Sequence, residues 1–129
     1  MINTNKAASF SDLLGKTITK IGGMEKDADS IDFYCSDGSL YKLFHTQDCC
    51  EDVDIEDVAG DPNDLLNSPI LDAREETSSN NPSGVTIEYQ DSFTWTFYIL
   101  STIKGSVTVR WYGSSNGYYS ESMDFERVK

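Results

Sequence analysis

The strongest structural signal in the chain is the run Phe93-Thr94-Trp95-Thr96-Phe97-Tyr98-Ile99-Leu100. Successive side chains of a β-strand point to opposite faces of its sheet. Bulky side chains occupy both alternating sets of this run, which is typical of a strand with neighbours on both sides. The pattern therefore predicts a central β-strand over residues 93–100.

Two turn signals follow this run and divide the rest of the chain into strands. Lys104-Gly105 and Asn116-Gly117 both favour tight turns between antiparallel strands. Apolar and polar residues alternate over 107–112 and again over 119–125. We expect these segments and the strand at 93–100 to form a three-stranded antiparallel meander.

The first half of the chain also has β character. Residues 30–35 and 40–44 alternate on either side of Asp37-Gly38, which predicts a hairpin. Further strands are expected over 16–21, 52–57 and 70–77, with helical turns near 9–15 and 60–66. The sequence thus predicts a mainly β fold of about eight or nine short strands, as an antiparallel sandwich or partly open barrel. We expect a flexible tail over 1–9 and a single domain over 10–129.

The overall charge limits the classes of partner. The chain has 129 residues and a net charge of −12 at pH 7. Duplex nucleic acid and anionic membranes attract basic surfaces, so neither is an expected partner. A partner protein with a basic surface is compatible with this charge.

The cysteine count and the length of the apolar runs indicate where in the cell the protein is expected. Three cysteines are an odd number, and no N-terminal run has the pattern of a secretory signal. No apolar run reaches the roughly 18 residues that a membrane-spanning helix needs. We expect a cytoplasmic protein with reduced thiols.

The segment from His45 to Asp57 contains the densest set of reactive side chains. It combines the only histidine, two cysteines and a run of carboxylates. We expect it to leave its sheet extended, with its side chains diverging. Its acids would then form an exposed protein-binding face, with candidate residues Asp48, Glu51, Asp52, Asp54, Glu56 and Asp57.

Two other kinds of chemistry are open to the same segment. His45, Cys49 and Cys50 could ligate a metal, although adjacent cysteines on an extended chain point apart. His45 could also activate a cysteine nucleophile, but the surrounding acids would raise the pKa of the thiol. We therefore favour no metal, no cofactor and no catalytic residue.

A second candidate surface lies near the C-terminus, where aromatic rings surround one arginine. The candidate residues for ligand binding are Arg110, Trp111, Tyr112, Tyr118 and Tyr119. An arginine among rings can stack on a base or bind a phosphate. The competing interpretation places Trp111 and Tyr119 in the core, because aromatic residues at a period of two usually pack inside.

Several motifs also resemble those of a known family. The blocks are His45-Thr46-Gln47-Asp48-Cys49-Cys50-Glu51, then Ile55-Glu56-Asp57 with Gly60-Asp61, and the late aromatic segments. Together they resemble a family of small uncharacterised proteins from bacteriophages and prophages, with the likeness covering roughly residues 15–127. The resemblance implies a setting in an infected host and no known activity.

We expect a non-enzymatic phage accessory protein that binds a host protein. Its acidic surface could imitate nucleic acid and inhibit a host defence or nucleic-acid-binding protein. A small-molecule or nucleotide-binding module is the first alternative. A metal-binding protein is the second.

Overall fold

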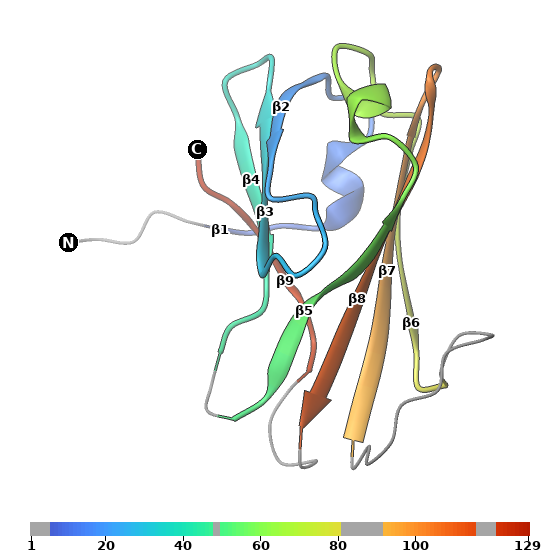
Figure 1. The fold of residues 1–129 in the computed structure, drawn as a ribbon. Helices are drawn as coiled ribbons and strands as arrows, with labels where there is room; N and C mark the ends of the chain where they lie inside the picture. Colours follow the sequence, from blue (N-terminus) through green and yellow to red (C-terminus); the bar gives the residue numbers. More distant parts are fainter. Residues whose placement is uncertain (1–5, 48–49, 81–91, 116–120) are drawn as a thin grey trace.

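The computed structural model describes residues 6–47, 50–80, 92–115 and 121–129. In these residues the chain forms two antiparallel sheets that face each other as a β-sandwich (Figure 1). The first sheet has the order β1-β9-β4-β3-β2 and consists of β1 (Lys6–Ala7), β2 (Ile18–Gly22), β3 (Ser30–Cys35), β4 (Leu40–Phe44) and β9 (Asp124–Arg127). The second has the order β5-β8-β7-β6 and consists of β5 (Asp52–Ala59), β6 (Asp72–Ser78), β7 (Ser92–Thr102) and β8 (Gly105–Ser115).

Helical structure in the described residues is limited to two short 3-10 helices, η1 (Phe10–Leu13) and η2 (Pro62–Leu65). Each begins at a residue suited to cap it, because Ser9 forms a capping box with Asp12, and the Asp61 side chain accepts from Asn63 N. The expected fold class is confirmed: the protein is mainly β and sandwich-like.

The hairpin predicted in the first half is present as β3 and β4. Phe33 lies opposite Tyr41 in the register, and the turn contains Gly38 at a φ of +87°. A backbone angle in this range favours glycine. Ile31 and Phe33 are fully buried on the inner face, as their alternation predicts.

Strand β7 is central, as predicted, because it pairs with β8 on one side and with β6 on the other. Its inner face places Tyr98 and Leu100 in the core between the sheets. Trp95 belongs to the outer face, where it is buried beside Arg110 and Tyr112. Bulky side chains on one face of β7 therefore fill the core, and those on the other face pack against side chains of β8.

The predicted C-terminal meander is wrong. Strand β9 pairs with β4 and β1 in the first sheet, and β5 is the second neighbour of β8. The reason is the burial of Phe125, whose ring stacks on Tyr41 at 5.3 Å between centroids and contacts Phe10 at 5.4 Å. This aromatic packing is available only in the first sheet.

An irregularity in β2 resolves an ambiguity of the sequence. Ile18 and Ile21 are three residues apart, so a regular strand would point them to opposite faces. The register shifts between Ile18 and Lys20, so that Ile18 lies opposite Cys35 and Ile21 opposite Phe33. A β-bulge thus turns both isoleucines toward the core.

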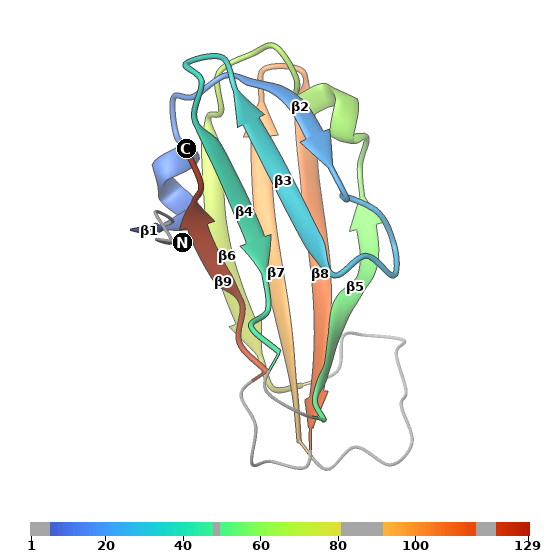
Figure 2. The same cartoon turned by 90° about the vertical axis from the view of Figure 1, so that its left-hand side faces the viewer.

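The predicted tail extends too far into the chain. Lys6 and Ala7 pair with Arg127 and Glu126 of β9, and Ser9 caps η1. η1 lies between the two sheets and buries Phe10 and Leu13 (Figure 1). Figure 2, which views the first sheet from outside, places η1 at the β9 side of the sandwich. Residues 6–9 are therefore part of the folded domain.

We expect Phe125→Ala to lower the free energy of unfolding by about 3–5 kcal/mol, because it removes a buried ring. Phe44→Ala is the matched control, since Phe44 is half-buried on the outer face of β4. Urea unfolding followed by tryptophan fluorescence measures both. Equal losses in the two variants would contradict the assignment of Phe125 to the core.

Candidate functional site

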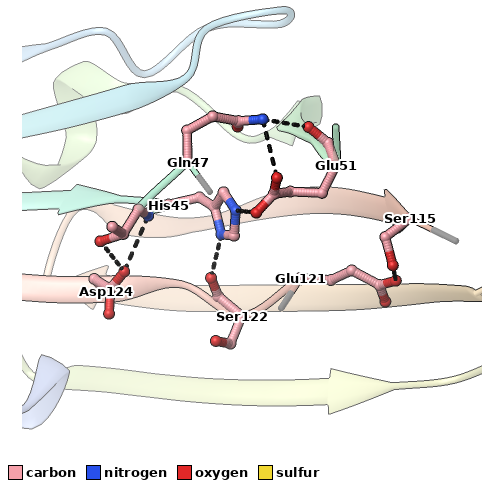
Figure 3. A network of polar contacts seen from close by, with 8 residues as sticks. His45, Gln47, Glu51, Ser115, Glu121, Ser122 and Asp124 are labelled. Carbon is pink, nitrogen blue, oxygen red and sulfur yellow. Dashed lines mark hydrogen bonds and ion pairs between the residues drawn. The ribbon is translucent and has the colours of Figure 1, made fainter. Parts of the chain in front are cut away.

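A buried polar network joins the end of β4 to the segment that precedes β5 (Figure 3). The side chains of His45 and Glu51 are 4% and 0% exposed, and His45 Nε2 lies 2.9 Å from Glu51 Oε2. His45 Nδ1 lies 2.6 Å from the carbonyl oxygen of Ser122, next to β9. One imidazole therefore connects three segments of the chain.

The two contacts of His45 limit where its protons lie. The carbonyl of Ser122 can only accept, so Nδ1 carries a proton. Nε2 faces a carboxylate, so one further proton lies between Nε2 and Glu51. Gln47 Nε2 donates to the Glu51 backbone oxygen at 2.6 Å and to Glu51 Oε1 at 3.1 Å. The pair is thus buried with its hydrogen bonds formed.

A second carboxylate lies at the same end of the sandwich. Glu121 is buried and accepts hydrogen bonds from Thr94 Oγ1 at 2.9 Å and from Ser115 Oγ at 2.5 Å. Gly113 makes room for it, because a Cβ at Gly113 would lie 3.0 Å from Glu121 Cβ. These contacts attach the segment before β9 to β7 and β8.

Thr46 completes the connection between β4 and β9. Its backbone N and its Oγ1 both donate to Asp124 Oδ2, at 3.0 and 2.6 Å. The network as a whole holds together the ends of five strands, β4, β5, β7, β8 and β9. This geometry indicates a structural role, because Glu51, Glu121 and Asp124 each already accept hydrogen bonds from side chains of the protein.

The expectation that the side chains of this segment diverge is wrong for His45, Gln47 and Glu51. Glu51 also does not belong to the exposed acidic face, since its side chain is fully buried. It is in phase with Val53 and Ile55, which point inward along β5. Extending the alternation of β5 back by one step would have predicted this orientation.

The remaining described acids of the segment are on the surface. Asp52, Asp54 and Asp57 are exposed, and Glu56 is half-buried. Glu56 lies at the register shift of β5, where its Oε2 is 2.5 Å from Arg110. Asp48 lies outside the described residues.

The connection between β2 and β3 brings further carboxylates to β5. Asp27 N donates to the Ile55 carbonyl at 2.8 Å, and Ile55 N donates to the Ala28 carbonyl at 2.9 Å. These two bonds place Asp27 and Asp29 near Asp54. We call the resulting surface the acidic face, and its residues are Asp27, Asp29, Asp52, Asp54 and Glu56.

Crowding on the acidic face has an electrostatic cost. Partial desolvation raises the pKa of the Asp54 carboxyl, and the charges of Asp27, Asp52, Asp29 and Glu56 raise it further. Like charges near an acid disfavour its ionised form. The fold therefore holds these carboxylates together against their mutual repulsion.

The proposed aromatic site is divided between the two faces of β8. Trp111 is 1% exposed and belongs to the core, as the competing interpretation predicts. Arg110 lies on the outer face, 5.3 Å from the Trp95 ring, and its guanidinium is paired with Glu56. Tyr112 lies 4.6 Å from Trp95 on the same face. Trp111 therefore cannot share a ligand with Arg110 and Tyr112, and Tyr118 and Tyr119 lie outside the described residues.

The metal hypothesis finds little support in the described part of the chain. No group of three or more histidine, cysteine or acidic residues is arranged there to hold a metal ion. Cys50 is disulfide-bonded, whereas Cys35 is a buried free thiol. The expectation of reduced thiols is therefore confirmed for Cys35 and wrong for Cys50. Cys49 lies outside the described residues.

The protein is a small antiparallel β-sandwich with a buried histidine–glutamate pair at one end and an acidic edge strand. Residues 11–125 match the model of a domain family described as a domain of unknown function, DUF7448, and the chain belongs to that family. No curated protein and no solved structure matches the chain. The expected phage origin stays a prediction. In the described residues, no helix has the length and apolar character needed to cross a membrane.

We expect Glu51→Ala to destabilise the protein by about 3–5 kcal/mol, because it leaves a buried histidine without its carboxylate. Asp52→Ala is the control: it removes a neighbouring acid from the surface and should change stability by less than about 0.5 kcal/mol. Urea unfolding measures both variants. A loss for Glu51→Ala as small as that of the control would contradict the buried pair.

The raised pKa of Asp54 predicts a stability that depends on pH. The ionised carboxyl destabilises the fold above its folded-state pKa, and protonation removes this cost as the pH falls. Asp54→Asn should therefore stabilise the protein at pH 7, by less than about 1 kcal/mol because solvent screens the charge. The gain should shrink in acid. Thermal unfolding from pH 7 to pH 4 tests this, with Asp32→Asn on the first sheet as the charge control, and a gain that grows in acid would contradict it.

Proposed function

We propose that the protein is a non-enzymatic binding protein whose acidic face docks on a partner protein with a basic surface. The observation that carries the proposal is the convergence of two separate segments on one group of carboxylates. The β2–β3 connection is held to β5 by a pair of backbone hydrogen bonds at Ile55. Acids needed only for solubility would have no reason to be gathered in this way.

Charge complementarity supports this kind of partner. The chain carries a net charge of −12, and a field of one sign increases the rate of encounter with a surface of the opposite sign. Outward positions on a strand repeat every ~6.8 Å, which is twice the ~3.4 Å rise per nucleotide along one DNA strand. Asp52 and Asp54 occupy two such positions. A basic groove that binds nucleic acid is therefore the kind of surface that we propose as the target.

The phage setting implied by the motif resemblance makes the proposal more specific. The partner would be a host defence or nucleic-acid-binding protein, and occupation of its basic groove would inhibit it. The proposed role requires neither a cofactor nor a reaction on the partner. It also requires no direct contact of this chain with nucleic acid.

The test uses immobilised protein and basic host nucleic-acid-binding proteins across a salt series. We expect Asp52→Asn/Asp54→Asn to slow association severalfold at low salt, with the difference narrowing as salt screens the charges. Surface plasmon resonance measures the association rates.

The matched control is Asp32→Asn/Glu126→Gln, which removes the same number of charges from the first sheet. It should leave association nearly unchanged if the acidic face makes the contact. Equal effects of the two double variants would mean that only net charge matters. Retention that does not depend on salt, or the lack of any basic partner, would reject the proposal.

The nucleotide-binding alternative receives less support from the geometry. Arg110, the cation that would bind a phosphate, is already paired with Glu56, and Trp111 faces the core. A nucleotide would have to displace Glu56 from Arg110. A thermal-shift screen with nucleotides tests this alternative, because a bound ligand stabilises the folded state.

A further inference from the structure

A cleft of about 380 Å³ lies at the opposite edge of the second sheet from the acidic face. It opens where β6 and β9, which belong to different sheets, are separated by η1. Figure 1 shows η1 between the sheets at this place. Its lining consists of Ala8, Ser9, Phe10, Ser11, Ala73, Glu75, Met123 and Phe125.

Aromatic rings form the inner part of the cleft. The Phe10 ring lies 4.7 Å from the Tyr98 ring and 5.4 Å from the Phe125 ring. Ala8 and Ala73, which have small side chains, also line the cleft. The face of an aromatic ring attracts a cation through its quadrupole, and does so more strongly where water is partly excluded.

Glu75 provides a negative charge at the mouth of the cleft. It lies opposite Tyr98 in the register, so it is in phase with buried Ala73 on the side of β6 that faces the sandwich interior. Glu75 is exposed to solvent, and its side chain is hydrogen-bonded to Tyr98. In the part of the chain that the structure describes, Glu75 has no ion-pair partner, whereas its neighbour Glu76 pairs with Arg74 on the outer side.

The hydroxyl of Tyr98, opposite Glu75 in the register, cannot supply a positive charge. Burial raises the pKa of the Tyr98 hydroxyl, and the charge of Glu75 and the hydrogen bond between the two side chains raise it further. Tyr98 is therefore a neutral hydroxyl at physiological pH. Among the described residues, the lining contains one carboxylate and no lysine, arginine or histidine.

We propose that this cleft binds an organic cation, an alkylammonium or quaternary ammonium group, with Glu75 as its counter-charge and the rings of Phe10 and Phe125 as its aromatic wall. The volume is in the range of pockets that take small ligands, about 300–1,000 Å³. The ammonium could belong to a free amine or to a lysine side chain of another protein. The proposal does not depend on the acidic face, because β5 and β6 are opposite edges of the second sheet.

Titration with choline and with its neutral isostere 3,3-dimethylbutan-1-ol, followed by ¹H–¹⁵N NMR, tests the proposal. Choline should shift the amide signals of residues 8–11, 73–75 and 123–125. The neutral isostere should bind about tenfold more weakly, which corresponds to the usual strength of a partly buried cation–π contact.

Two variants connect the binding to Glu75. Glu75→Gln should weaken choline binding about tenfold, and Glu75→Lys should abolish it. Glu76→Gln is the matched control, because it removes the adjacent carboxylate from the outer side of the same strand. It should leave choline binding unchanged.

The outcomes separate the two sources of the cation. Tighter binding of Nα-acetyl-lysine methylamide than of choline would indicate a lysine side chain, and the reverse would indicate a free amine. Both results support the cleft. Shifts that are absent from the cleft, equal binding of the neutral isostere, or equal effects of Glu75→Gln and Glu76→Gln would overturn the proposal. A failure here would leave the salt-dependent association through β5 unaffected.

Discussion

The burial of Phe125 is the constraint on which the rest of the structure depends. Its ring is 9% exposed and contacts rings from η1, β3 and β4, namely Phe10, Phe33 and Tyr41. A strand paired with β8 could not place this ring among them. The chain therefore crosses from the second sheet to the first after β8, and β5 takes the place next to β8.

The crossing also explains why the polar network lies where it does. It brings the start of β9 to the end of β4, so that His45 reaches the Ser122 carbonyl and Thr46 reaches Asp124. A buried pair of ionisable side chains adds little net stability compared with well-packed apolar residues, but losing one partner is costly. The His45–Glu51 pair therefore contributes mainly by fixing which strand ends meet.

The alternation of apolar and polar residues along short segments predicted the parts of the fold that depend on contacts between residues close in sequence. The hairpin at Asp37-Gly38 and the central strand at 93–100 have both their strand pattern and their turns within a short span. The partner of β9 could not be predicted, because a ring such as Phe125 can be buried in either sheet and only long-range packing decides. In the site, the inward orientation of Glu51 could have been predicted, because Glu51 lies two residues before the inward-pointing Val53. The cleft at Glu75 required the position of η1 and the register with Tyr98.

The phase of each strand also separates the roles of its acids. On β5 and the residue before it, Glu51 points inward and is bound by His45, whereas Asp52 and Asp54 point outward and have no ion pair within the described residues. On β6 the outward Glu76 is paired with Arg74, whereas the inward Glu75 is hydrogen-bonded to Tyr98 and has no ion pair within the described residues. Within the described residues, acids without an ion pair thus lie at both edges of the second sheet, on an open strand face at β5 and beside an aromatic cleft at β6. An open face suits a broad basic surface and a cleft suits a single ammonium group, so the two proposed cationic partners would occupy opposite edges of the sheet and would not compete.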